Sequence, residues 1–165
     1  MTEACHTFAS PEETRAFGLA LGQRLLPFDF IALRGTLGAG KTLLVRGAAE
    51  GAGVPESEQA SSPTFALAHL YRGGRVPILH LDLYRVESAA ELFAIGLDDM
   101  LAEPCAALCE WPEKAGAALP PERLELLLEH AGEQARRMTL TAIGARAEAL
   151  RGQLLATLRP EKNAR

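Results

Sequence analysis

The stretch Gly35-Thr36-Leu37-Gly38-Ala39-Gly40-Lys41-Thr42 carries most of the information about the fold of this chain. It matches the pattern G-x-x-x-x-G-K-[ST] at every fixed position, a match expected by chance in roughly one of 500 chains of this composition. The apolar residues 28–33 directly before it predict a buried strand. The residues after it, from about 40 to 51, predict a helix. Strand, glycine-rich turn and helix in this order are the setting in which the pattern binds phosphate.

The residue types in this stretch explain why it would bind phosphate. Glycines at 35, 38 and 40 let the backbone wrap closely around an anion, with successive N–H groups pointing inward. The helix after the turn adds the positive end of its dipole. The Lys41 ammonium is suited to the β- and γ-phosphate oxygens, and the Thr42 hydroxyl is suited to the ligand shell of Mg²⁺. We therefore predict a site for a nucleoside triphosphate and Mg²⁺.

Hydrophobic patterning along the rest of the chain predicts an α/β domain. Strands are expected over 5–8, 65–71, 76–84 and 105–109, and a hairpin is expected over 123–130 and 136–143. Helices are expected over 10–26, over 88–101 with an interruption at Gly96, and over 145–158. Residues 1–165 are therefore expected to form one domain, in which the residues after about 159 are a frayed tail.

The composition excludes several classes of protein. Hydrophobic residues make up 48% and charged residues 23% of the 165 residues, as in ordinary globular proteins. No apolar run approaches the roughly 18 residues of a membrane span, and the first residues lack a signal-peptide pattern, so no membrane contact and a cytoplasmic location are expected. The net charge of −4 does not favour polyanion binding. Cys105 and Cys109 lie in an apolar run and are expected to be small buried residues.

Two acidic residues are candidates for the chemistry, because hydrolysis also needs a carboxylate for the metal and a group that orients water. Glu110 directly follows the apolar run 105–109, at the carboxyl end of a predicted central strand, where ligands bind in open α/β sheets. Asp82 lies in a segment whose alternation puts His80, Asp82 and Tyr84 on one strand face. That face could instead be the solvent side of the strand, and Trp111, next to Glu110, could be a core residue.

Four motifs follow one another along the chain. They are residues 35–42, Ser62-Pro63-Thr64-Phe65, His80-x-Asp82-x-Tyr84-Arg85 and Glu110-Trp111-Pro112-Glu113. In this order they resemble the bacterial TsaE (YjeE) family, over about residues 8–143. The resemblance implies a small ATPase that works with TsaB and TsaD in making threonylcarbamoyladenosine next to the anticodon of tRNA, touching tRNA only indirectly or weakly. It also implies a P-loop fold with a mostly parallel central sheet, flanking helices and additional antiparallel strands and hairpins.

The resemblance further implies a role for each matching residue. The phosphates of ATP would be held by the loop residues Leu37, Gly38, Ala39, Gly40, Lys41, Thr42 and Leu43, and Trp111 would flank the nucleotide. Thr42 and Glu110 would bind Mg²⁺. Lys41 and Asp82 would also act in catalysis, Asp82 as the catalytic or water-orienting carboxylate. Thr64, the third catalytic candidate, would lie in a loop that senses the γ-phosphate. The adenine pocket is not fixed by a motif, and the candidates for it are residues 8–10 and Arg136 or Arg137.

Two other functions remain open on the sequence. One is a small nucleoside or metabolite kinase, although residues 60–121 hold only three arginines and no evident lid insertion. The other is a nucleotide-gated interaction module with negligible turnover. Hydrolysis by the isolated chain is expected to be slow, because Arg85 would lie on the opposite strand face from Asp82 if the strand extended that far.

Overall fold

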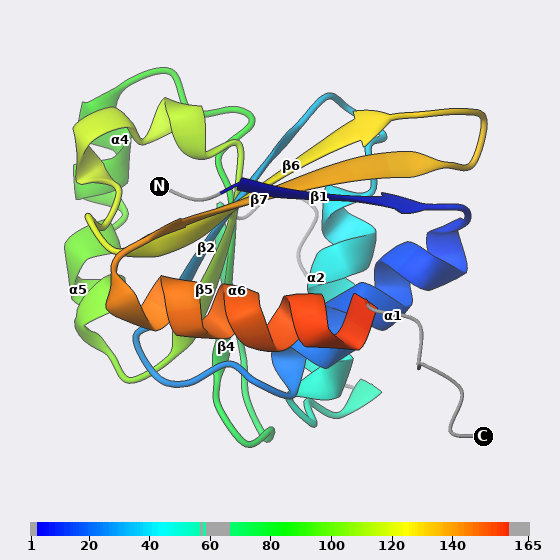
Figure 1. The fold of residues 1–165 in the computed structure, drawn as a ribbon. Coiled ribbons are helices and arrows are strands. Elements are labelled where there is room, and N and C mark those ends of the chain that lie inside the picture. Colours follow the sequence, from blue (N-terminus) through cyan, green and yellow to red (C-terminus); the bar gives the residue numbers. More distant parts are fainter. Residues whose placement is uncertain (1–2, 57, 59–66, 159–165) are drawn as a thin grey trace, which may run out of the picture.

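The computed structural model describes residues 3–56, 58 and 67–158, which form a sheet with helices packed on both faces (Figure 1). The strands are β1 Glu3–Phe8, β2 Phe30–Gly35, β3 Ala68–Tyr71, β4 Ile78–Asp82, β5 Ala106–Glu110, β6 Arg123–His130 and β7 Arg136–Ile143. The helices are α1 Pro11–Gly22, α2 Lys41–Gly51, α4 Ala89–Ala94, α5 Leu97–Ala102 and α6 Ala145–Leu158, with short 3₁₀ turns η1 Pro112–Lys114 and η2 Gly116–Ala118. The predicted tail after residue 159 lies outside the described residues.

The sheet has the strand order β1-β7-β6-β2-β5-β4-β3. Its four central strands are parallel, because β2 pairs with β6 on one side and β5 on the other, and β5 pairs with β4. The outer pairs β1–β7, β7–β6 and β4–β3 are antiparallel. This arrangement confirms the predicted α/β class, with a mostly parallel centre and additional antiparallel strands and hairpins.

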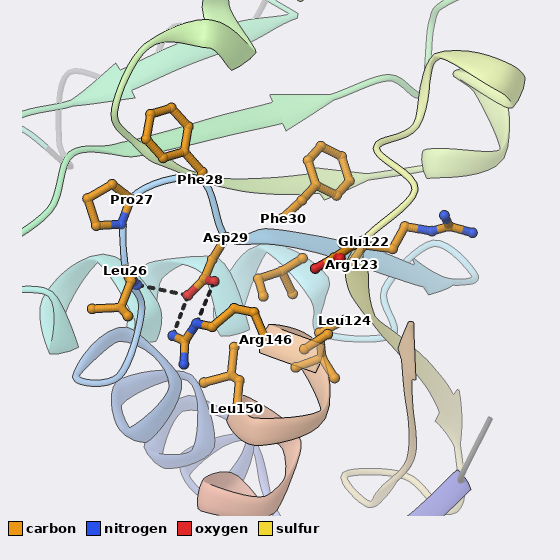
Figure 2. Close-up of a pocket in the computed structure, with 12 residues that line it drawn as sticks. Leu26, Pro27, Phe28, Asp29, Phe30, Glu122, Arg123, Leu124, Arg146 and Leu150 are labelled. Atoms are coloured by element: carbon orange, nitrogen blue, oxygen red, sulfur yellow. Dashed lines mark hydrogen bonds and ion pairs between the residues drawn. The ribbon is translucent and has the colours of Figure 1, made fainter. Parts of the chain in front are cut away.

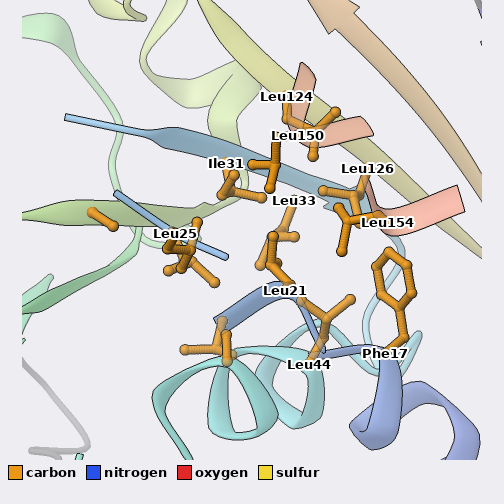
Figure 3. Close-up of a cluster of buried hydrophobic side chains, with 14 of the residues drawn as sticks. Phe17, Leu21, Leu25, Ile31, Leu33, Leu44, Leu124, Leu126, Leu150 and Leu154 are labelled. Atoms are coloured by element: carbon orange, nitrogen blue, oxygen red, sulfur yellow. The ribbon is translucent and has the colours of Figure 1, made fainter. Parts of the chain in front are cut away.

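Two hydrophobic cores cover the two faces of the sheet. One core joins α1, α2 and α6 to the sheet, and in Figure 3 Leu21, Leu33, Leu44 and Leu154 converge from these helices and from β2. The other core joins α4 and α5 to the opposite face, which fits their place across the central strands from α1 and α2 in Figure 1. None of the helices in the described part of the chain is long and apolar enough to cross a membrane.

Several predicted boundaries are confirmed to the residue. The hairpin strands β6 and β7 and helix α6 span the expected residues, and Gly96 separates α4 from α5 in a left-handed conformation with φ 72°. Helix α1 begins after Ser10, whose Oγ accepts a hydrogen bond from the Glu13 N–H at 3.3 Å. Cys109 is buried as expected, and burial raises the pKa of its thiol to about 12, helped by the nearby Glu110 carboxylate.

The first central strand begins two residues later than expected, at Phe30 in place of Phe28. Phe28 has a left-handed backbone with φ 71°, which no strand residue adopts. The Asp29 side chain turns back to accept the Leu26 N–H at 2.8 Å and pairs with Arg146 of α6, with Nε–Oδ1 at 2.9 Å (Figure 2). The chain therefore makes a closed turn before it enters β2.

Strand β4 ends at Asp82, two residues earlier than expected. The Asp82 Oδ1 accepts a hydrogen bond from the Tyr84 N–H at 3.1 Å, and this local bond turns the chain out of the sheet. Arg85 therefore follows a turn, and the strand-face argument for its direction does not apply. Residues 65 and 66 of the preceding predicted strand lie outside the described residues.

Candidate nucleotide and metal site

The turn between β2 and α2 has the backbone that its glycines suggest. Gly38 and Gly40 have φ values of 76° and 102°, in the left-handed region that favours glycine. Gly40 is the N-cap of α2 and provides no side-chain hydrogen bond to the first turn of the helix. The N–H groups at the start of α2 are thus not capped by a side chain, and such groups bind anions.

A cavity of about 270 Å³ opens at this turn. It lies at the carboxyl ends of the parallel strands β4 and β5, where open α/β sheets bind their ligands. Its lining comprises Leu37, Gly38, Ala39, Gly40, Lys41, Thr42, Leu43, Asp82, Tyr84, Glu110 and Trp111. Every described residue that was predicted to bind phosphate or Mg²⁺, to flank the nucleotide or to act in catalysis lines this one cavity. Thr64 lies outside the described residues.

Lys41 is the positive charge of the cavity. Its side chain is largely buried, and Nζ donates hydrogen bonds to the carbonyl oxygens of Gly35 at 2.7 Å and Thr36 at 2.9 Å. Burial lowers the pKa of Lys41 from its ordinary value, while the carboxylates of Glu110, Glu113 and Asp82 act in the opposite direction. An anionic ligand here would stabilise an ammonium that has lost much of its hydration.

The Lys41 ammonium also lies 4.3 Å above the ring centroid of Trp111, a cation–π distance. Trp111 is half-buried and has a left-handed backbone with φ 59°. Its ring packs against Tyr84 at a centroid distance of 5.0 Å, and Tyr84 is half-exposed. Trp111 thus touches the second core and also forms a wall of the cavity, so the core interpretation describes only part of its environment.

Glu110 and Thr42 form the oxygen-rich part of the cavity. The Thr42 hydroxyl donates to Glu110 at 3.0 Å from Oε1 and 3.3 Å from Oε2, and the Glu110 side chain is only 4% exposed. Carboxylate and hydroxyl oxygens are ligands that suit Mg²⁺, which takes its other ligands from phosphate oxygens and water. The two residues therefore fit the metal role implied by the sequence.

Asp82 lies directly opposite Glu110 in the parallel register of β4 and β5. The side chains of His80 and Asp82 share the strand face of Ile78, which belongs to the core formed with α1 and α2. Ile78 is buried and the His80 side chain is only 12% exposed, so this face of β4 is not its solvent side. Asp82 is half-buried at the rim of the cavity, where a carboxylate could contact a bound water.

The sequence did not predict the contact that His80 makes. Its Nε2 lies 2.9 Å from Glu110 Oε1, and its Nδ1 lies 3.3 Å from the Tyr71 hydroxyl. Strand alternation placed His80 on the face of Asp82, but the contact depends on the pairing of β4 with β5. That register comes from residues far apart in the chain, and no local pattern specifies it.

Arg136 of β7 binds the backbone of the turn between β2 and α2. From the first residue of β7, its guanidinium donates to the Ala39 carbonyl oxygen at 3.1 Å and to that of Gly38 at 3.3 Å. Arg136 was a candidate for the adenine pocket, and the structure places it against the backbone of the turn between β2 and α2. Phe8, another candidate, is a buried core residue whose ring packs against Phe17.

Known proteins resemble this chain over most of its length. Residues 8–138 match the family model described as "Threonylcarbamoyl adenosine biosynthesis protein TsaE". A Bacillus subtilis protein named "tRNA threonylcarbamoyladenosine biosynthesis protein TsaE" is 38% identical over 141 residues, which cover 86% of this chain and 87% of the relative. A protein of the same name from Nostoc sp. is 36% identical over 139 residues, which cover 81% of this chain and 82% of the relative. The crystal structure of Bacillus subtilis YdiB is similar with a TM-score of 0.80 at 32% identity, covering 96% and 97% of the two chains.

Proposed function

Because the chain belongs to the TsaE family, we propose that it binds and hydrolyses ATP with Mg²⁺ in the biosynthesis of threonylcarbamoyladenosine in tRNA, as a subunit that acts with TsaB and TsaD. One observation carries the proposal. The phosphate-binding turn, the buried Lys41 and the Thr42–Glu110 pair line a single cavity at the carboxyl ends of the central strands. The role in tRNA modification implies a cytoplasmic location.

The residues of the cavity divide the work of binding. The uncapped N–H groups at the start of α2 and the Lys41 ammonium would hold the phosphates. Thr42 and Glu110 would hold Mg²⁺, which when bound neutralises phosphate charge. Trp111 and Tyr84 would close the apolar side of the cavity. Asp82 would accept a hydrogen bond from the attacking water and orient it toward the γ-phosphorus.

The charge balance of the cavity supports partner-dependent turnover. Among the described residues that line it, Lys41 is the only lysine or arginine, whereas Asp82 and Glu110 are both acidic. The negative charge that spreads over the transferred phosphoryl group is then only partly neutralised by the chain itself. A partner that adds a cation or reshapes the cavity would accelerate the reaction.

A second candidate function has one observation in its favour. A groove of about 790 Å³ adjoins the turn on the β6 side and is lined in part by Thr36, Leu37, Trp111 and Leu127. Such a groove has room for an acceptor molecule, as a small kinase would require. In that case the phosphoryl group from ATP would appear on the acceptor and not as inorganic phosphate.

The proposal is tested by reconstituting the modification of tRNA from purified proteins. The reaction contains TsaB, TsaD, the small molecules of the pathway, unmodified tRNA and either this chain, its Lys41→Ala variant or no addition. We expect threonylcarbamoyladenosine to accumulate over many cycles only with the unaltered chain. Equal accumulation with Lys41→Ala, or transfer of the γ-phosphoryl group of ATP to a small molecule, would contradict the proposal.

A further inference from the structure

Two side chains outside the proposed binding residues form a chain of contacts that ends on Glu110. The Tyr71 hydroxyl of β3 lies 3.3 Å from His80 Nδ1 of β4, and His80 Nε2 lies 2.9 Å from Glu110 Oε1 of β5. The contacts therefore connect three neighbouring strands of the sheet. The His80 side chain is only 12% exposed and the Glu110 side chain 4%, so water competes little for these bonds.

The direction of each hydrogen bond follows from the groups involved. A carboxylate oxygen only accepts hydrogen bonds, so His80 Nε2 is the donor to Glu110. In the neutral ring Nδ1 is then the acceptor, and the Tyr71 hydroxyl is its donor. The Tyr71 hydroxyl thus stabilises the tautomer in which the proton faces Glu110. The Tyr71 ring also packs against the His69 ring, with a centroid distance of 4.5 Å.

The two oxygens of Glu110 are held unequally. Oε1 accepts from His80 at 2.9 Å and from Thr42 at 3.0 Å, whereas Oε2 has only the longer 3.3 Å contact with the Thr42 hydroxyl. Oε2 is therefore the oxygen that is more available to a metal ion. Side chains that orient a metal-binding group through a hydrogen bond commonly change metal affinity 10- to 100-fold when they are removed.

We propose that His80, oriented by Tyr71, is a positioning residue that holds the Glu110 carboxylate with Oε2 directed to the divalent metal ion. The inference rests on the proposed function, because it takes Glu110 as a metal ligand. It adds that strand β3, through Tyr71, contributes to metal affinity without touching metal or nucleotide.

The test measures metal binding directly. Binding of Mn²⁺ to the protein saturated with ADP is followed by electron paramagnetic resonance, and ADP affinity in EDTA is measured by calorimetry. The variants are His80→Leu, which removes the donor, His80→Gln, whose amide donates from the position of Nε2, and Tyr71→Phe, which keeps the ring and removes the hydroxyl. His6→Gln, a histidine on the edge strand β1, is the matched control.

We expect His80→Leu to weaken Mn²⁺ binding about 10- to 100-fold and ADP binding in EDTA less than about 2-fold. His80→Gln should recover most of the loss. Tyr71→Phe should weaken Mn²⁺ binding roughly 3- to 10-fold while it still unfolds cooperatively, and His6→Gln should bind Mn²⁺ as the unaltered chain does.

Unchanged Mn²⁺ affinity in His80→Leu and Tyr71→Phe, or an equal loss of ADP affinity in EDTA, would overturn the inference. If His80→Leu does not fold, Tyr71→Phe and His80→Gln still decide it. A Glu110→Ala variant that binds Mn²⁺ normally would show instead that the metal assignment of the proposed function has failed.

Discussion

At the scale of single residues, Lys41 is buried and carries a positive charge that the anionic phosphates of the proposed ligand would neutralise. Its ammonium fits between two backbone carbonyls and the ring of Trp111. Lys41→Ala removes this charge and should weaken binding of ATP with Mg²⁺ about 10- to 100-fold. Lys41→Arg should not restore it, because a planar guanidinium does not fit a site shaped for a compact ammonium. Calorimetric titration measures both, and unchanged affinity in Lys41→Ala would exclude the phosphate site.

Replacing each of the two acidic residues of the cavity should affect hydrolysis in a different way. Glu110→Ala should raise the Mg²⁺ concentration needed for half-maximal hydrolysis by about 10-fold or more, because it removes a proposed ligand. Asp82→Ala should leave ATP affinity within a few-fold and lower the rate by about 10²-fold, the range of a group that acts on the attacking water. Rates measured with the partner proteins across a Mg²⁺ series separate the two effects. Normal hydrolysis by Asp82→Ala would contradict its catalytic role.

The sequence predicted the residues whose places are fixed by local spacing. The turn residues, Lys41 and Thr42 follow from one strand–turn–helix motif, and Glu110 follows from the end of an apolar run. The contacts of His80 and Tyr71 could not be predicted, because they depend on how β3, β4 and β5 are aligned side by side. A spacing motif specifies neighbours along the chain, whereas strand register specifies neighbours across the sheet.

At the scale of elements, boundaries were predictable where a local residue sets them. Gly96 and Gly144 have left-handed backbones at the ends of their predicted elements, and the boundaries there are correct. The start of β2 was wrong because it depends on the pairing of Asp29 with Arg146, which are 117 positions apart. Residues 28–33 are apolar apart from Asp29, whose bonds to the nearby Leu26 N–H and to the distant Arg146 hold residues 28 and 29 in a turn.

Helices α1 and α2 pack so closely that they leave no room for side chains at their contact. A Cβ atom added at Gly22 would lie 1.9 Å from the Ala48 carbonyl oxygen. Gly22→Ala should therefore lower the free energy of unfolding by about 2–3 kcal/mol. The matched control is Gly152→Ala inside α6, where a Cβ meets nothing within 4 Å. This substitution should raise the free energy of unfolding by about 0.5–1 kcal/mol. Urea unfolding measures both, and equal effects would contradict the close packing.

Strands β2 and β6 are also joined by charge. Glu125 Oε1 accepts from Arg123 Nε at 2.7 Å and Oε2 from Arg34 Nε at 3.2 Å. Burial alone would raise the pKa of Glu125, but the hydrogen bonds and charges of the two arginines lower it below its ordinary 4.5. A carboxylate with a lowered pKa stabilises the fold above its ordinary pKa, and this stabilisation is lost as the pH falls through the lowered value.

Glu125→Gln should therefore lower the free energy of unfolding by about 1 kcal/mol at pH 7, since the pair is only partly shielded from solvent. The difference from the unaltered chain should shrink as the pH falls below 4.5 through the lowered pKa of Glu125. Urea unfolding across this pH range checks this, and a difference that stays constant with pH would show that the charge of Glu125 is not the cause.

At the scale of the whole molecule, the sheet brings Asp82, Glu110 and the turn between β2 and α2 together at the carboxyl ends of its central strands. Both faces of β2, β5 and β4 carry a hydrophobic core, and the cavity lies at the carboxyl ends of these strands. The α/β class and this general location were predictable from the order of buried runs and motifs. The strand order β6-β2-β5-β4, which sets the distances within the site, was not.

The proposed function requires that this cavity hydrolyse ATP and that its partners complete it. The most direct measurement is the rate of phosphate release from ATP by the chain alone and with TsaB–TsaD, for the unaltered protein and Thr64→Ala. We predict slow release alone and at least about 10-fold stimulation by the pair, toward the ~10³–10⁵ that a completed site brings in GTPases. Thr64→Ala should reduce the stimulated rate more than the basal rate. Fast hydrolysis by the lone chain, or no stimulation by TsaB–TsaD, would contradict the account.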